Sequence, residues 1–339
     1  MVDSGLSYQV NSLVFICVNL RSFHPGEFRD CGQSFSLRDL FAYIRVHWRF
    51  TLKTMKIIFD EAATRYGDSQ HPERAERLLS TVPHLQKVLP QLVWERPSIA
   101  DDKSLLLAHD EAHLARLRQP IDFDLDTPYY PEIDQHARRA ASGALLAAKS
   151  ARQGQPAFSL LRPPGHHAKR AQAMGFCYLN SIAVAALNAL NDGCERVAIW
   201  DFDAHHGNGT EAIVTGNQQV LFASIHQYPG YPGTGTRSFQ NILNWPIPPM
   251  TDGEVHAAKV KEALDRLVAF RPDLLLVSAG FDAYLQDPLT NLRLEAEHFY
   301  RFGIWLREIN IPVAAILEGG YSNELPGLIE SFIRGWIAD

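Results

Sequence analysis

The pattern of apolar residues constrains the fold of this chain more strongly than any other feature of its sequence. From Met55 onward, short uninterrupted apolar runs alternate with longer segments of helical periodicity, such as 181–193 and 253–270. Such runs between helices are typical of a parallel sheet with helices on both faces. The predicted strands are 56–59, 157–161, 196–200, 220–225, 274–280 and 313–320. We therefore predict an α/β fold, a doubly wound parallel sheet in a single domain.

Residues 1–54 differ in pattern from the rest of the chain. They mix polar and aromatic residues and contain no cluster of chemically functional side chains. We interpret 1–54 as an N-terminal extension, or as sequence upstream of a natural start at Met55, and assign the domain to 55–339. The alternative is a packed N-terminal helical segment around Leu37–Trp48.

The composition argues against several classes of partner. Lys and Arg total 32 against 38 Asp and Glu, and a net charge of −6 gives no overall basic field for nucleic acid. The apolar run at 13–18 is too short to span a bilayer and lacks a preceding basic segment, so we expect no membrane association and no secretion. Four cysteines are scattered without a CxxC pair: Cys17, Cys31, Cys177 and Cys194. We interpret them as free thiols and expect a cytoplasmic protein.

Polar and glycine-rich motifs stand at the ends of five predicted strands. In chain order they are RPPGHH, DFDAHHGNG, SIH, GFDAYLQDP and EGGY. In an open parallel sheet, ligands bind outside the carboxyl ends of the strands. We therefore expect the five motifs to meet at one edge of the sheet and to form an active site.

Three of these side chains are candidate metal ligands. Asp203 and His205 lie two residues apart after a strand, so both point to the same side in an extended conformation. With Asp282, which follows another strand, they offer three ligands and leave one position open, as in a catalytic zinc site. Zinc is favoured, although oxygen-rich ligation also suits Mn²⁺ or Fe²⁺. The alternative is a pair of aspartates that cap turns beside a solvated histidine.

His166 and His167 are candidates for proton transfer. A metal ion acidifies water and polarises a carbonyl, and a histidine can move the proton to a leaving amine near neutral pH. Two adjacent imidazoles disfavour a double charge, so different partners would separate their protonation. Asp201 could raise the basicity of one histidine, and Asn208 could orient the other without strongly stabilising its cation. Alternatively, the histidines lie on a surface loop and Asn208 is a turn residue.

Aromatic side chains are candidates for substrate contacts. Tyr321 follows two glycines after the last strand and could donate a hydrogen bond to a developing oxyanion. Gly175, Phe176 and Tyr231 could form an aromatic-walled slot that leads to the metal. Core or loop packing is the alternative explanation for each of these aromatic residues.

From Met55 to its C-terminus, the chain resembles the zinc-dependent histone deacetylases and their bacterial relatives, which include the acetylpolyamine amidohydrolases. The motifs that carry this resemblance occur in order: HPERAERL, RPPGHHA, GFCYLN, DFDAHHGNGT, PGTG, GFDAYLQDP and EGGY. Any one could arise by chance, but the ordered set is highly specific. The resemblance implies the arginase/deacetylase fold and a deacetylase-like catalytic domain at 55–339.

The resemblance implies two kinds of bound cation. Asp203, His205 and Asp282 would bind one zinc ion per chain. Asp201, Ser224 and backbone carbonyls near Asp203 and His205 would hold a monovalent cation, K⁺.

The resemblance also implies catalytic roles. His167 would act as the general base and acid, and His166, supported by Asp201, would be its electrostatic companion. Tyr321 would polarise the acyl carbonyl. Asn208 stands where some members have aspartate, as is usual in the class II-like branch, which includes several bacterial enzymes.

Substrate contacts are the last group that the resemblance implies. Gly175, Phe176 and Tyr231 would line the channel for the acyl-lysine, and Asp126 would contribute to substrate binding. Leu289 follows an Asp-Pro pair shortly after the metal ligand of its strand, so we expect it at the rim of the channel. Relatives specialised for acetylated polyamines can carry glutamate there, which attracts cationic amines. A leucine favours acetylated lysine, in a peptide or a similar small amide.

We therefore expect a metal-dependent deacetylase that hydrolyses an acyl amide. An acetylpolyamine amidohydrolase is the main alternative, and a non-catalytic module that binds acyl-lysine or metal is a weaker one. Hydrolysis of guanidines, as in arginases, needs two bridged metals and more carboxylates than this ligand set provides. The chain passes compactly from Asp126 to Arg162, without an evident dimer-forming insertion, so the sequence leaves the oligomeric state open.

Overall fold

The structure is a computed structural model that describes residues 55–337 of the 339-residue chain. Several predictions lie outside the described residues: the extension at 1–54, the alternative helical segment at Leu37–Trp48, the apolar run at 13–18, and Cys17 and Cys31. Cys177 and Cys194 lie within them, and both are buried free thiols, as predicted.

All eight described strands form one parallel sheet in the order β2-β1-β3-β8-β7-β4-β5-β6. The strands are β1 Lys56–Ile58, β2 Val93–Glu95, β3 Ala157–Ser159, β4 Val197–Asp201, β5 Val220–Gln227, β6 Ile242–Ile247, β7 Leu274–Ala279 and β8 Val313–Leu317. The six predicted strands are all present. The two unpredicted ones, β2 and β6, form the edges of the sheet. β2 is partly exposed and β6 contains Pro246, which an edge strand tolerates, so neither has the continuous apolar pattern of a central strand.

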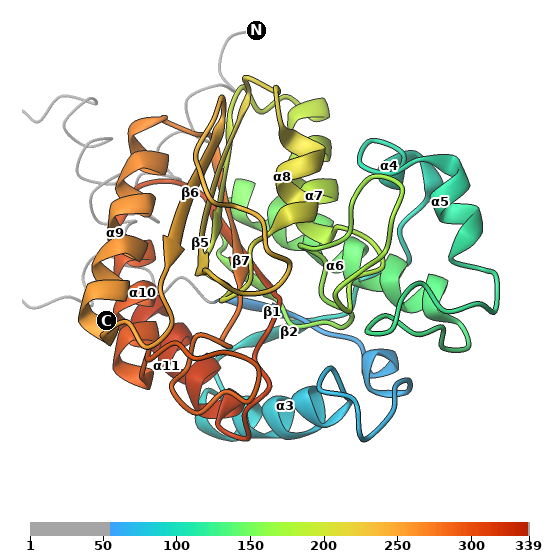
Figure 1. Cartoon of the computed structure of the whole chain (residues 1–339), viewed down its shortest axis with the longest axis horizontal. Coiled ribbons are helices and arrows are strands. Elements are labelled where there is room, and N and C mark those ends of the chain that lie inside the picture. The colour runs from blue at the N-terminus through green and yellow to red at the C-terminus, as the bar shows by residue number, and fades with distance from the viewer. Residues whose placement is uncertain (1–54, 338–339) are drawn as a thin grey trace, which may run out of the picture. The chain divides into compact units, whose positions relative to one another are not determined.

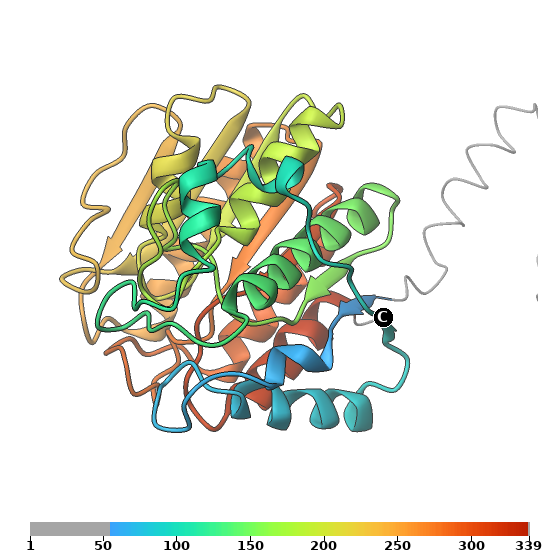
Figure 2. The same cartoon turned by 90° about the vertical axis from the view of Figure 1, so that its right-hand side faces the viewer.

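Helices cover both faces of the sheet, which confirms the doubly wound architecture. The α-helices are α3 Glu76–Val88, α4 Asp102–Leu105, α5 Glu111–Arg116, α6 Ile133–Arg152, α7 Ser181–Asn191, α8 Asn208–Val214, α9 Gly253–Ala269, α10 Ala296–Glu308 and α11 Leu325–Ile337, and the 3-10 helix η3 spans Glu61–Thr64. Helices α6, α7 and α8 lie on one side of the strands, and α9, α10 and α11 lie on the other (Figure 1). Figure 2 shows the same arrangement after a quarter turn. Among the described helices, none combines the length and the apolar character needed to cross a bilayer.

The core lies on both faces of the central strands. Every residue of β4, β7 and β8 is buried, as expected where helices cover a parallel sheet on both sides. Immediately beyond β4, the ring of Phe202 packs edge-on against Phe281 and Phe332, with centroids 6.2 and 5.7 Å apart. Phe202 and Phe281 belong to the motifs themselves, so their buried rings anchor the strand ends that carry the polar motif residues.

A buried ion pair ties the segment before α3 to the RPPGHH motif. The Nη2 atom of Arg162 donates a 2.7 Å hydrogen bond to Oε2 of Glu73, and its Nε donates to Oε1. Arg162 also donates to the carbonyl of Ala63 and lies over the ring of Tyr66, 4.4 Å from its centroid. Burial opposes ionisation of Glu73, but the charges of Arg162 and Arg77 and the hydrogen bonds from Arg162 lower its pKa. The buried pair of Arg162 and Glu73 therefore anchors the RPPGHH motif to the segment before α3.

We predict that Glu73→Gln lowers the free energy of unfolding by about 3–5 kcal/mol at neutral pH, because Arg162 then stays buried without a counter-charge. An unfolded glutamate has a pKa of about 4.3, and the folded-state pKa of Glu73 is lowered. The pair therefore stabilises the fold fully above the unfolded pKa, and the stabilisation disappears as pH falls through the folded pKa. Urea unfolding at neutral and acidic pH measures both effects.

Glu262→Gln is the matched control for this experiment. It removes an exposed pair in which Lys259 and Glu262 are 48% and 52% exposed, so we expect a change within about 0.5 kcal/mol. Equal losses in the two variants, or a Glu73→Gln deficit that grows on acidification, would contradict the account of the buried pair.

Candidate functional site

The five motifs meet because the strands that carry them are consecutive in the sheet. The order β3-β8-β7-β4-β5 brings together the ends that bear RPPGHH, EGGY, GFDAYLQDP, DFDAHHGNG and SIH. All strands run in one direction, so these segments leave the sheet at the same edge. This convergence agrees with the expected position of the site.

Asp203, His205 and Asp282 form the one group of potential metal ligands found among residues 55–337. Their ligand atoms lie within 4.8 Å of one another. Nδ1 of His205 is 2.9 Å from Oδ2 of Asp282 and 3.3 Å from Oδ1 of Asp203. Both aspartates are fully buried. Two carboxylates and one imidazole in this arrangement suit a single divalent cation with an open position, rather than the bridged pair of metals that arginase chemistry needs.

Backbone amides hold the two candidate ligand carboxylates in place. Gly319 donates a 2.7 Å hydrogen bond to Oδ2 of Asp203, and Ala204 donates one of 2.8 Å to Oδ1 of Asp282. A β-carbon at Gly319 would lie 2.3 Å from Oδ2 of Asp282 and 2.6 Å from Oδ2 of Asp203. Glycine is therefore required for this backbone to approach both carboxylates.

The electrostatics of this group also fit a cation. Burial opposes a charge on His205, but the carboxylates of Asp282 and Asp203 raise its pKa to about 10. Burial together with the charge of Asp203 raises the pKa of Asp282. Both shifts report an excess of buried negative charge, which a bound divalent cation would neutralise.

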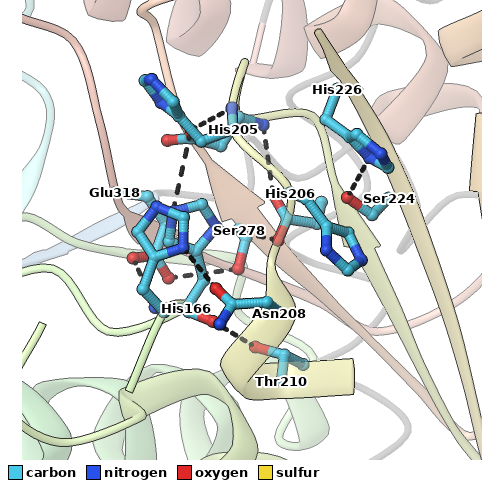
Figure 3. A network of polar contacts seen from close by, with 12 residues as sticks. His166, His205, His206, Asn208, Thr210, Ser224, His226, Ser278 and Glu318 are labelled. Carbon is cyan, nitrogen blue, oxygen red and sulfur yellow. Dashed lines mark hydrogen bonds and ion pairs between the residues drawn. The ribbon is translucent and has the colours of Figure 1, made fainter. Parts of the chain in front are cut away.

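His166 and His167 have different partners, as predicted. Their ring centroids are 4.0 Å apart. Nδ1 of His166 donates to Oδ2 of Asp201 at 3.0 Å, and Nδ1 of His167 donates to Oδ1 of Asn208 at 2.7 Å. Figure 3 shows Asn208 at the start of α8, among the residues that surround His166. Both histidines are buried, so they are not the surface residues of the alternative interpretation.

These partners move the two pKa values in opposite directions. Burial opposes a charge on His166, but the carboxylates of Asp203 and Asp201 raise its pKa well above the usual range. Burial and the neighbouring His166 lower the pKa of His167 well below it. His167 is therefore neutral at pH 7, and because its Nδ1 donates to Asn208, its Nε2 carries the free lone pair.

The tyrosine of EGGY also lies in this region. The Tyr321 ring packs edge-on against Phe176, with centroids 5.8 Å apart, and the guanidinium of Arg77 lies 5.0 Å from its centroid. Burial raises the pKa of Tyr321 well above its ordinary value, so its hydroxyl stays protonated. Oxyanion stabilisation requires such a protonated donor.

Gly175 and Tyr231 lie beside the proton-transfer residues. The Tyr231 ring is perpendicular to that of His167, 5.1 Å away, and its centroid is 6.2 Å from that of His205. Gly175 has φ of +57°, and a β-carbon there would approach the His167 ring to 2.6 Å and the Tyr231 hydroxyl to 2.9 Å. Phe176, also at positive φ, is held by a 3.1 Å hydrogen bond from its amide to Oγ1 of Thr127. Aromatic walls therefore adjoin the histidines and the metal ligands.

Asp126 and Leu289 lie on exposed loops. Asp126 is exposed, and its carbonyl is 3.3 Å from Nε2 of His71, whose ring packs against Phe176. Leu289 is 37% exposed, and its amide donates to Oδ1 of Asp287. Asp287 also accepts the amide of Tyr321. Both predicted substrate contacts are therefore linked to residues that adjoin the site.

The predicted monovalent-cation residues are also close together. Asp201 and Ser224 are paired across the neighbouring strands β4 and β5, and the amide of Asp203 lies 3.2 Å from Oδ1 of Asp201. The Ser224 hydroxyl is 2.9 Å from Nδ1 of His226 (Figure 3).

Sequence reasoning missed Glu318 and Asp287. Glu318 is fully buried, and its Oε2 accepts the amides of Gly165 and His166 at 2.7 and 3.1 Å. Its Oε1 accepts the hydroxyl of Ser278, a contact visible in Figure 3. Both carboxylates belong to the motifs at the strand ends, but each accepts a hydrogen bond from a backbone amide far away in the sequence. The only sequence signal for these roles was a carboxylate directly after an apolar strand, for Glu318, or in a turn before a proline, for Asp287.

Comparisons with known proteins agree with this geometry. The chain is 36% identical over 294 residues to a probable deacetylase of Archaeoglobus fulgidus, covering 79% of this chain and 81% of the relative. The crystal structure of the HD domain of HDA15 superposes with a TM-score of 0.78 at 30% identity, covering 85% of this chain and 89% of that one. An acetylpolyamine aminohydrolase from Burkholderia pseudomallei superposes with a TM-score of 0.76 at 28% identity, covering 84% and 99%. A family model for the histone deacetylase domain matches residues 70–334, so the chain belongs to the histone deacetylase family.

Proposed function

We propose that this enzyme hydrolyses the acetyl amide of lysine, in a peptide or a similar small amine. The observation that carries this proposal is a buried histidine pair, one member bonded to a carboxylate and the other to an amide, beside a group of three candidate metal ligands. His167 can accept a proton, His166 fixes the local field, and the ligand group lies alongside them. A binding module would need none of this proton-transfer machinery. The free cysteines suit a reducing compartment, so we propose a cytoplasmic location.

We assign one zinc ion per chain to Asp203, His205 and Asp282. When bound there, zinc supplies a Lewis acid that polarises the acyl carbonyl and makes a water molecule more acidic. We assign K⁺ to the carboxylate of Asp201, the Ser224 hydroxyl and nearby carbonyls, because oxygen ligands suit a hard cation. Both assignments rest on the chemistry of the donor groups.

The proton moves through His167. Its Nε2 takes a proton from the attacking water as the new carbon–oxygen bond forms, and the imidazolium then returns a proton to the nitrogen of the leaving amine. Asn208 keeps the ring in the required tautomer through its bond to Nδ1. His166 stays charged beside Asp201 and keeps His167 from being protonated too early.

Tyr321 stabilises the negative charge that develops on the acyl oxygen. Its hydroxyl remains protonated because burial raises its pKa, so it can donate a hydrogen bond as the carbonyl becomes an oxyanion. The contacts of its ring with Phe176 and Arg77 limit its movement, so the donor is held in place before reaction.

We predict that His167→Ala lowers kcat on an acetyl-lysine peptide by at least about 10²-fold, the loss expected for a general acid and base. The variant should retain its metal, because His167 is outside the ligand group. His166→Ala should be milder, because it removes the electrostatic companion and leaves the proton carrier. Steady-state kinetics over a pH series, with metal analysis of each variant, measure these effects.

His84→Ala is the control, since this partly exposed histidine pairs with Glu330 on α11 and belongs to none of the five motifs. Its kcat should match that of the native enzyme. A greater loss in His166→Ala than in His167→Ala would reverse the roles that we assign to the pair.

The rim distinguishes acetyl-lysine from acetylpolyamine substrates. Leu289 offers apolar contact and no negative charge, so we predict that kcat/KM is higher for an acetyl-lysine peptide than for N-acetylputrescine or N-acetylspermidine. Burial of part of a leucine side chain contributes less than the roughly 1.5–3 kcal/mol of full burial, enough to bias the preference. Leu289→Glu should shift the preference towards the polyamines, because the new carboxylate attracts their distal amines. Side-by-side kinetics on the three substrates measure the ratio.

Leu285→Glu serves as the control for added charge, because Leu285 is 42% exposed on the same segment but is not assigned to the rim. An equal shift in both variants would indicate long-range attraction rather than contact at Leu289. A native enzyme that prefers acetylpolyamines would overturn this interpretation of the rim and leave the deacetylase chemistry intact.

A further inference from the structure

Asp287 is a buried carboxylate that neither the metal group nor the proton-transfer pair uses. It lies on the loop after β7, five residues beyond Asp282, yet it is only 6% exposed. It is absent from the ligand group formed by the described residues. Burying a carboxylate costs free energy unless hydrogen bonds satisfy its oxygens. The hydrogen-bond partners of Asp287 therefore indicate its structural role.

The two oxygens of Asp287 bind two different loops. Oδ2 accepts the amide of Tyr321 at 2.7 Å, and Oδ1 accepts the amide of Leu289 at 3.0 Å. Tyr321 follows β8 on another segment of the chain, whereas Leu289 is close to Asp287 in sequence. One side chain thus joins the segment that carries the hydroxyl donor to the segment that carries the rim leucine.

The tyrosine segment needs such an anchor because it has no regular secondary structure. Tyr321 lies between the end of β8 at Leu317 and the start of α11 at Leu325. Gly320 precedes it with φ of +121°, a conformation outside helix and strand. Arg77 donates to the carbonyls of Glu318 and Gly320, but the Tyr321 amide donates to Asp287. The peptide group between Gly320 and Tyr321 is therefore held from both sides, at its carbonyl by Arg77 and at its amide by Asp287.

We propose that Asp287 is a positioning residue that holds the Tyr321 hydroxyl in place and couples it to the rim at Leu289. This inference rests on the proposed function, in which Tyr321 donates to the oxyanion. Displacing a catalytic group by about 1 Å can cost about 10²-fold in rate, so a backbone anchor can matter as much as the group itself. A substrate that displaces Leu289 would also shift Tyr321, because the backbone amides of both residues donate to the Asp287 carboxylate.

A double-mutant cycle between Asp287→Asn and Tyr321→Phe tests the proposal. The amide has the shape of the carboxylate but only one acceptor oxygen, so one backbone amide loses its partner. We expect Asp287→Asn to lower kcat on an acetyl-lysine peptide by at least about tenfold, with metal content retained. Tyr321→Phe should lose about 10²–10³-fold, as for removal of an oxyanion donor. Adding Asp287→Asn to Tyr321→Phe should cost less than about twofold further, because the donor is already absent.

A second substrate separates positioning from general damage to the fold. Trifluoroacetyl-lysine has a more electrophilic carbonyl and depends less on the hydroxyl donor. Both single variants should therefore lose less kcat on it than on acetyl-lysine, whereas a misfolded fraction would lower both rates equally. If Asp287→Asn does not fold, Asp287→Ser, which keeps one small acceptor, enters the same cycle.

Asp273→Asn is the matched control. Oδ2 of Asp273 accepts the amides of Glu195 and Arg196 at 2.7 and 2.9 Å, so it also binds two backbone donors. It precedes β7 and therefore lies at the opposite edge of the sheet from the site. The single acceptor oxygen of asparagine can still bind both amides, so this variant should fold normally and leave kcat within about twofold of the native value.

The possible outcomes are distinct. Native kcat in Asp287→Asn, or losses that multiply fully in the double variant, would overturn the positioning role and leave the proposed function standing. Native kcat in Tyr321→Phe would overturn the role of Tyr321 in the proposed function, and the positioning role with it.

Discussion

Negative charge buried at the carboxyl edge of the sheet is the constraint on which the rest of this site depends. Asp201, Asp203, Asp282 and Glu318 are all fully buried. Such a concentration of carboxylates is tolerated only where amides, imidazoles or cations satisfy it. The loops at this edge supply backbone amides. Those of Gly319 and Ala204 donate hydrogen bonds to Asp203 and Asp282. Glu318 accepts the amides of the RPPGHH turn.

The same excess of charge accounts for the asymmetry of the histidine pair. His166 is close to two carboxylates, so it favours the charged form, whereas His167 faces an amide and favours the neutral form. The residue types are identical, and the difference comes entirely from the neighbours that the fold supplies. Asp203, a candidate metal ligand, therefore also helps to determine which imidazole can accept a proton.

The sequence allowed a large part of this arrangement to be predicted. Continuous apolar runs identified all six inner strands, because a strand buried on both faces consists mainly of apolar residues. The ends of those strands then located the site, and the structure brings the predicted ligands and histidine partners together. The edge strands β2 and β6 lack this pattern, since exposure and a proline are permitted there.

The remaining features depend on contacts that span long stretches of the chain. Glu318 binds amides more than 150 residues away, and Arg162 pairs with a glutamate 89 residues away. Asp287 binds an amide 34 residues away. Local composition and spacing carry no information on which backbone amide will lie opposite a given carboxylate. These contacts follow from the strand order β1-β3-β8-β7, which periodicity alone does not determine.

Titration of the metal-free protein with zinc tests the central claim most directly. The measurement is turnover of an acetyl-lysine peptide as a function of zinc added per chain, with bound zinc determined in parallel. One ligand group of Asp203, His205 and Asp282 predicts no turnover without metal and a plateau at one equivalent, and it predicts that Asp282→Ala neither retains zinc nor turns over substrate. A plateau at two equivalents, or full turnover by the metal-free protein, would contradict the account.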